Sequence, residues 1–188
     1  LYEVEQAVRA ANPTRHLPDG LVIGQVRQLP DPAVRESIVN GCVHRDWAQP
    51  DPTVVEHVGA TLVGNSPGGF VGGVTPQNII THPSQTRNRA LVELLAALRV
   101  AEREGVGVDR MVREMVRSGN PPPDIAETAG PRVRTALVGD VVDAGWMRWL
   151  ARLRPSDRRV DLNTLLLLRQ LVDRWRMDVR SMAPVIQS

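Results

Sequence analysis

The sequence predicts an α/β fold, a two-layer sandwich with helices on one face of a mixed or antiparallel sheet, followed by a small helical segment. Residues 53–58 and 61–64 alternate like two strands of a hairpin around Gly59. Segments with apolar residues at helical spacing flank this hairpin. Residues 1–140 hold 14 Arg and 16 acidic residues, whereas residues 141–188 hold 9 Arg and 5 acidic residues. We therefore predict an α/β domain over 1–140 and a helical segment over 141–188.

The elements of the first domain follow from apolar spacing and from the Gly and Pro residues between them. Apolar residues three and four apart predict helices, alternating ones predict strands, and Gly or Pro marks the ends. The expected order is a helix at 3–11, a strand at 21–29, a helix at 35–47 that starts near Asp31 or Pro32, the hairpin, a flexible loop at 65–73, a helix at 89–104, a helix from 108 to a cap at Gly119, and a strand at 132–139.

The C-terminal segment is expected to be entirely helical. Trp146 and Trp149 share one apolar face, and a leucine-rich stripe at 165–175 forms another. Asp161 precedes that stripe and suits the start of its helix, because its carboxylate can accept bonds from free N–H groups. A shorter helix is expected at 178–186.

Composition excludes several classes of protein. No apolar run reaches the roughly 18 residues of a membrane span, so we expect no membrane association. Cys42 is the single cysteine, which excludes an internal disulfide and suits a reducing cytoplasm. All 23 basic residues are arginines, as codon bias in a GC-rich genome would produce. Because Leu1 is not an initiator Met, we expect a piece of a longer protein.

The helix at 35–47 carries the first candidate site residues. Glu36, Asn40 and His44 lie at i, i+4 and i+8 on one half of this helix, opposite an apolar half. An acid and an amide one turn apart can orient a water and hold a hard cation, as a nucleotide site requires. The alternative is a surface helix with a solvated polar face, and the spacing alone favours that alternative.

Two glycine-rich segments complete the candidate site. The segment 65–73 has four glycines, which would let its backbone approach a ligand closely. Gly105 and Gly107 lie at the start of a predicted helix, where free N–H groups and the positive dipole end suit phosphate. Gly105 fits a plain C-cap of the preceding helix equally well.

The order of these motifs resembles a known family over residues 20–140. The motifs are REsivNgcvHRDW at 35–47, the hairpin, NSPGG at 65–69, and RN to EGvGvDRM at 87–111. This combination resembles the HATPase-type domain of bacterial transcriptional regulators, which are grouped as distant relatives of the ATP-dependent DNA helicase RecG. That domain is similar to the GHKL ATP-binding fold of gyrase, a heat-shock chaperone family and histidine kinases. Full-length members place an AlbA-like (Schlafen-type) domain before it and a winged helix-turn-helix after it.

The resemblance implies roles for several of these residues. Glu36 would polarise an attacking water, and Asn40 would bind Mg²⁺ that bridges the phosphates of ATP. Gly105 and Gly107 would cradle the phosphates. Residues 162–186 resemble the first two helices of the winged unit, although they could also be helices that simply pack on the first domain.

The sequence departs from the pattern of that fold at two points. Asn65, with Gly68 and Gly69, stands where the fold uses an Asp to read adenine. The chain has no lysine, so Arg45 or Arg110 would have to bind the phosphates. We therefore expect little or no ATP turnover.

Three functions remain open from the sequence. The first is a cytoplasmic transcriptional regulator whose α/β domain senses a ligand or pairs subunits, and whose full-length form is a homo-oligomer that binds DNA. The second is an ATP-dependent enzyme of nucleic-acid metabolism related to RecG. The third is a degenerate scaffold that dimerises and binds no cofactor.

Overall fold

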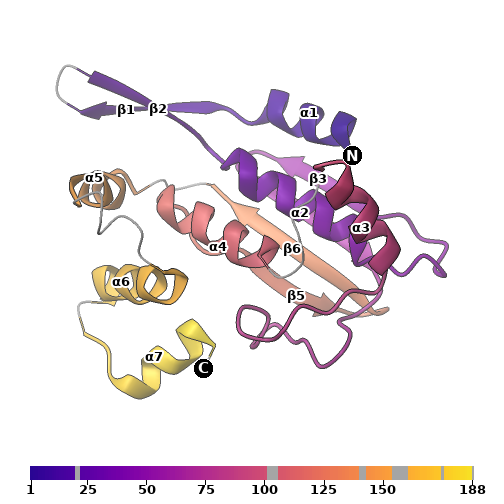
Figure 1. Cartoon of the computed structure of the whole chain (residues 1–188). Coiled ribbons are helices and arrows are strands. Elements are labelled where there is room, and N and C mark those ends of the chain that lie inside the picture. The colour runs from indigo at the N-terminus through magenta and orange to yellow at the C-terminus, as the bar shows by residue number, and fades with distance from the viewer. Residues whose placement is uncertain (20–21, 101–105, 140–142, 154–160, 175, 188) are drawn as a thin grey trace.

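A computed structural model describes residues 1–19, 22–100, 106–139, 143–153, 161–174 and 176–187. Within these residues the chain forms seven helices and two antiparallel sheets (Figure 1). The helices are α1 Tyr2–Ala11, α2 Asp31–Val43, α3 Arg89–Ala97, α4 Gly107–Arg117, α5 Ala144–Arg152, α6 Leu162–Arg174 and α7 Val179–Ile186. The strands are β1 Thr14–Asp19, β2 Val22–Arg27, β3 Val54–Val58, β4 Thr61–Pro67, β5 Asp124–Thr128 and β6 Arg132–Val138.

The main sheet has the strand order β3-β4-β6-β5 and is antiparallel throughout. The predicted hairpin is confirmed, since Val58 pairs with Thr61 at its turn. In the centre of the sheet Leu62 of β4 pairs with Leu137 of β6. Helices α2 and α4 lie across one face of this sheet (Figure 1). The predicted two-layer α/β class is therefore confirmed, with the antiparallel alternative as the observed one.

The core lies between this sheet and its two helices. Met111 and Met115 of α4 are buried here, so both methionines fill core space. Each fully buried apolar side chain of this kind stabilises the fold by about 1.5–3 kcal/mol. The main cluster consists of Val8, Leu29, Ala33, Val34, Ile38, Leu62, Met111, Met115 and Leu137.

The N-terminal helix is tied to this core by an asparagine. Asn12, which directly follows the helix predicted at 3–11, is the C-cap of α1 and is 1% exposed. Its side-chain amide donates to the Leu29 carbonyl at 2.7 Å and accepts from the Leu29 N–H at 3.0 Å. Beyond α1, the hairpin β1–β2 extends away from the main sheet (Figure 1).

Several predicted boundaries are wrong. The strand β4 continues through Pro67, so the first three residues of the predicted loop 65–73 are paired with β6. The helix predicted at 35–47 ends at Val43. Strands β1 and β5 lack a clear alternation of apolar residues and were not predicted.

The helix predicted to reach residue 104 ends at Ala97. The residue after its C-cap, Arg99, has a φ of 56° and therefore leaves the helical path. The guanidinium of Arg35 on α2 donates to the carbonyls of Arg99 and Val100, each at 2.7 Å. These bonds satisfy carbonyls that a longer helix would have paired internally.

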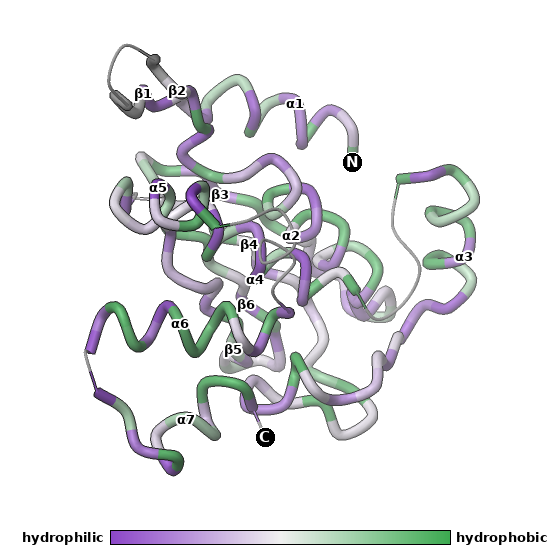
Figure 2. Tube along the Cα trace, turned by 60° about the vertical axis from the view of Figure 1, so that its left-hand side comes forward, coloured by the Kyte–Doolittle hydropathy of each residue, from purple (hydrophilic) through white to green (hydrophobic). Residues whose placement is uncertain are grey.

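The C-terminal segment is helical, as predicted. The Asp161 carboxylate accepts from the Thr164 N–H at 3.0 Å, which confirms the predicted start of α6. Figure 2 shows hydrophobic and hydrophilic turns alternating along α6, the pattern of a helix that is covered on one side. The covered side packs on α4, in a second cluster of Val112, Val116, Trp146, Leu162, Leu165 and Leu166. Helices α5 and α6 therefore share this cluster with the α/β domain. In the described part of the chain, every helix is too short or too polar to cross a lipid bilayer.

Candidate functional site

A cavity of about 180 Å³ lies between α2, the first turn of α4 and the strands β4 and β6. Residues 68–88, which connect β4 to α3 and are called the strap here, line its remaining side. Apolar side chains line much of the cavity, and polar ones come from α2, α4, β4, β6 and the strap. The polar lining residues include Glu36, Asn40, His44, Thr86, Asp109 and Thr135.

Glu36 and Asn40 face the first turn of α4. A Cβ atom added to Gly107 would lie 2.8 Å from Glu36 Oε2 and 3.6 Å from Asn40 Oδ1, so glycine permits this close approach. Glu36 is only 5% exposed. The interpretation of α2 as a surface helix with a solvated polar face is therefore wrong, because α4 covers its acid.

Burial sets the electrostatics of this corner. It raises the pKa of Glu36, while Arg110 and Arg35 lower that pKa by a smaller amount. Burial likewise raises the pKa of Asp109, against the lowering effect of Arg113. Two carboxyl groups that are costly to ionise thus border one cavity, an arrangement common at functional sites. Asp109 is part of the EGvGvDRM motif but was not predicted as a site residue, because an acid in the first turn of a helix is also common at a solvated helix start.

The raised pKa of Glu36 predicts a pH-dependent cost in stability. Because the pKa of Glu36 lies above its ordinary value of 4.5, the folded protein binds the proton of the Glu36 carboxyl group more tightly than the unfolded chain does. Stability therefore falls as the pH rises through the interval between the two pKa values. Glu36→Gln removes that loss, so its melting temperature relative to wild type should be higher at about pH 7 than at about pH 4. Thermal melts at both pH values measure this difference.

The matched control for this prediction is Glu56→Gln, because Glu56 is an exposed acid on the edge strand β3. Its melting temperature relative to wild type should hardly change between the two pH values. The raised pKa is contradicted if the melting temperature of Glu36→Gln relative to wild type is the same at both pH values. It is also contradicted if that difference changes with pH no more than it does for Glu56→Gln.

Several polar groups of the cavity have unused hydrogen-bonding capacity within the described part of the chain. The Thr86 Oγ1 atom is buried and has no hydrogen-bond partner. The side chains of Asn40 and Thr135 also border the cavity and make no hydrogen bond among the described residues. A polar ligand could satisfy all three groups, and an unmet buried hydroxyl costs about 1–3 kcal/mol.

Asn65 does not line the cavity, which corrects the prediction for it. Its neighbours Gly64 and Ser66 both border the cavity. Side chains of a strand alternate between the two faces, so Asn65 lies on the opposite face of the sheet. It was expected to approach the ligand from a loop, but β4 extends past it and pairs it with Arg134.

The arginines predicted to bind phosphate are also absent from the cavity lining. The Arg45 guanidinium lies 4.7 Å above the Trp47 ring and donates to the Gln49 carbonyl at 3.1 Å. Arg110 acts on the charge of Glu36 but does not border the cavity. Gly105 lies outside the described residues.

Gly68 and Gly69 do border the cavity, at the start of the strap. Cβ atoms there would lie 2.7 Å from the Asp46 Cβ atom and 2.7 Å from the Glu127 Oε1 atom, respectively. Gly68, with a φ of 98°, is therefore needed for close packing of protein on protein, whereas at Gly69 the flexible Glu127 side chain would have to move. A contact between their backbone and a ligand remains a prediction.

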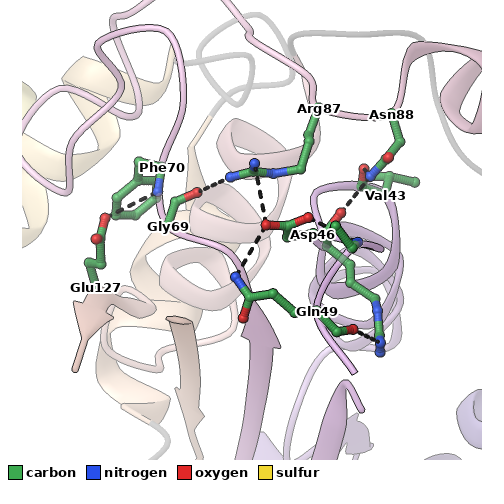
Figure 3. A network of polar contacts seen from close by, with 10 residues as sticks. Val43, Asp46, Gln49, Gly69, Phe70, Arg87, Asn88 and Glu127 are labelled. Carbon is green, nitrogen blue, oxygen red and sulfur yellow. Dashed lines mark hydrogen bonds and ion pairs between the residues drawn. The ribbon is translucent and has the colours of Figure 1, made fainter. Parts of the chain in front are cut away.

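The HRD and RN motifs contact one another (Figure 3). Arg87 forms an ion pair with Asp46 at 3.8 Å and donates to the Gly69 carbonyl at 3.1 Å. The Asn88 amide donates to the Val43 carbonyl at 2.8 Å and to the Arg45 carbonyl at 2.7 Å. These bonds satisfy carbonyls at the end of α2 and hold the strap in place. The two motifs therefore support the wall of the cavity.

The described residues contain no cluster of three or more His, Cys, Asp or Glu side chains that could hold a metal ion. Asn40 and Glu36 could supply two ligand oxygens, which is fewer than the roughly six that Mg²⁺ takes. A cation at this site would need further ligands from water or from a bound molecule.

The comparisons with known proteins agree with part of the resemblance. Residues 62–135 match a HATPase-type family model described as "Putative ATP-dependent DNA helicase recG C-terminal". This range contains most of β4, the strap, α3, α4, β5 and the first part of β6, but neither Glu36 nor Asn40. The match supports the RecG-related HATPase part of the resemblance over these residues.

The chain is also similar to a solved structure, that of the DIP2311 protein from Corynebacterium diphtheriae. The two are 34% identical, with a TM-score of 0.88. The match covers 98% of this chain and 38% of that one. No curated protein matches the sequence.

Proposed function

We propose that this chain is the nucleotide-sensing part of a bacterial transcriptional regulator, and that it binds ATP with Mg²⁺ in the cavity beneath the strap. One observation carries the proposal: Glu36 and Asn40 face the first turn of α4 across Gly107. The family match over residues 62–135 supports an ATP-binding domain related to RecG. The regulator role comes from the resemblance of the sequence motifs.

The first turn of α4 suits the phosphates. Its N-cap residue, Val106, has no side chain that caps the helix, so the first N–H groups have no side-chain partner there. Gly107, Val108 and Asp109 all border the cavity. The positive end of the helix dipole therefore points to the place where a negative group would lie.

Magnesium is required in this proposal because the described lining residues include neither Arg nor Lys. Bound Mg²⁺ would neutralise the phosphate charge. Asn40 would hold the cation through Oδ1, and Glu36 would orient a water molecule next to it. The Thr86 hydroxyl, which has no hydrogen-bond partner among the described residues, would bind a polar atom of the nucleotide.

Calorimetric titration of the chain with ATP and Mg²⁺ tests this proposal. We expect saturable binding with a dissociation constant below about 1 mM. Excess EDTA should abolish the binding, because it removes Mg²⁺ and no Arg or Lys among the described lining residues can replace it. Undiminished binding in EDTA would contradict the role of Mg²⁺, and no binding with Mg²⁺ present would favour a ligand-free scaffold.

Hydrolysis is expected to be slow or absent. The cavity supplies an acid in Glu36, but no described cation borders it to stabilise the charge that develops on the transferred phosphate. A coupled phosphate-release assay should therefore show turnover far below about 1 s⁻¹. Turnover near that rate, abolished by Glu36→Ala, would contradict this expectation and favour the alternative of an ATP-dependent enzyme.

The proposed DNA-binding role is assigned to a longer protein that would contain this chain. Residues 141–188 hold 9 Arg and 5 acidic residues, which supports weak, salt-dependent association with phosphates. Sequence-selective binding would need a reading element beyond these helices, and a homo-oligomer would present two copies of it. A mobility-shift comparison of this chain with the longer protein tests this division. Equal, sequence-selective binding by the chain alone would contradict it.

A further inference from the structure

The end of α7 is attached to the strap by three hydrogen bonds. The side-chain amide of Gln187 accepts from the Ile80 N–H at 2.7 Å and donates to the Pro76 carbonyl at 2.9 Å. The Thr81 hydroxyl donates to the Gln187 carbonyl at 2.9 Å. One residue thus satisfies three polar groups of a segment more than 100 residues away in the sequence.

An apolar contact reinforces this attachment. Ile80 of the strap and Val185 of α7 both pack against the cluster that joins α4 to α6. In Figure 1 the strap runs beside α7 at the lower edge of the molecule. The strap, α4, α6 and α7 therefore share one apolar contact region.

The same strap residues form a wall between two cavities. Ile79 and Ile80 border the candidate site on one side. On the other side they border a second cavity of about 960 Å³, between the strap, α4, α6 and α7. Val108, next to Gly107, also borders both cavities. A displacement of this wall would enlarge one cavity at the expense of the other.

The candidate site is too small for a whole nucleotide in the present arrangement. Its 180 Å³ lies below the roughly 300–1,000 Å³ of typical ligand sites. The strap is also held at its beginning, where Glu127 accepts from the Phe70 N–H at 3.1 Å and Arg87 binds Gly69. A ligand that needs more space would therefore displace the middle of the strap, which is where Gln187 binds.

We propose that α7 acts as a latch on the strap, and that Gln187 couples the C-terminal helices to ligand binding in the cavity. Occupation of the cavity would strain or release the bonds to Gln187, and withdrawal of α7 would make the cavity easier to enter. Such coupling is reciprocal, because each event changes the free energy of the other by the same amount. The identity of the ligand rests on the proposed function, whereas the latch does not.

Amide hydrogen exchange of Gln187→Ala, without any ligand, tests the latch. The Ile80 amide loses its acceptor, and its exchange should become about tenfold faster. Arg180→Ala is the matched control, because Arg180 is exposed on the same helix and its side chain forms no hydrogen bond or ion pair with the strap in the described part of the chain. Gln187→Glu keeps the acceptor for Ile80 and should restore most of the protection. Unchanged exchange at Ile80 in Gln187→Ala, or equal acceleration in Arg180→Ala, overturns the latch.

Titration with ATP and Mg²⁺ tests the coupling. Gln187→Ala should bind at least about threefold more tightly than wild type, because the lost bonds no longer oppose displacement of the strap. Equal affinity in the two proteins overturns the coupling. If wild type does not bind ATP but Ile80 still exchanges faster in Gln187→Ala, the proposed function fails and the latch stands.

Discussion

Replacing Gly119 with alanine should destabilise the protein by about 2–4 kcal/mol. Gly119 ends α4 with a φ of 75°, a conformation that alanine adopts only at a cost. An added Cβ atom would also lie 2.7 Å from the Asp143 nitrogen and 2.9 Å from its carbonyl oxygen. Both are backbone atoms, so no side chain can rotate away. The contact between the end of α4 and the start of α5 would have to shift. Denaturant unfolding measures the loss of stability.

Gly130→Ala provides a matched control for this prediction. Gly130 also has a positive φ, 85°, but no heavy atom lies within 4 Å of its added Cβ atom. Its cost should be conformational only, about 1 kcal/mol. Equal destabilisation by the two substitutions would contradict a steric clash at Asp143.

The second large effect is expected at Asn40. Asn40→Ala removes the proposed Mg²⁺ ligand and should weaken ATP binding at least about tenfold, which corresponds to about 1.4 kcal/mol. Since the Asn40 side chain makes no hydrogen bond among the described residues, the fold should tolerate its removal. Calorimetry in the presence of Mg²⁺ measures the affinity, and a thermal melt confirms that the variant is folded.

Asn65→Ala is the control, because it shows whether removing any asparagine side chain from this domain weakens ATP binding. Asn65 was a site residue by sequence, but its side chain lies on the sheet face away from the cavity. Its replacement should leave ATP affinity unchanged. Unaltered binding by Asn40→Ala, or an equal loss in both variants, would contradict the proposed position of the cation.

The polar face of α2 was predictable from the sequence, but its surroundings were not. Helical spacing placed Glu36 and Asn40 on one side because the period of an α-helix is fixed. Whether that side meets water depends on α4, which follows some 70 residues later. A contact of this range leaves no periodic signal, and the solvated interpretation was therefore the better supported one from spacing alone.

The wrong prediction that a loop begins at Asn65 has a local cause. Pro67 and the glycines after it suggested that a loop begins at Asn65. Proline is tolerated here because it is the last residue of β4, where its carbonyl accepts from the Asp46 N–H at 2.8 Å. Once β4 is extended, its alternation puts Asn65 on the outer face.

The wrong prediction for the Arg45 guanidinium and the failure to predict two polar lining residues both reflect tertiary contacts. Arg45 follows His44 in the sequence and was expected near the phosphates, but Trp47 and Gln49 hold its guanidinium. Thr86 and Thr135 come from separate segments that meet only in the folded chain. Neither threonine lies in a motif that sequence alone would single out.

Amide chemical shifts of the labelled chain during titration with ATP and Mg²⁺ test the proposed site most directly. Nucleotide binding beneath the strap predicts the largest changes at Gly107, Gly68 and Thr86, which border the cavity. The Gly130 amide, in the turn between β5 and β6, should change little. Saturable binding with no change at Gly107, or changes confined to the second cavity beside α6, would contradict a nucleotide site at the start of α4.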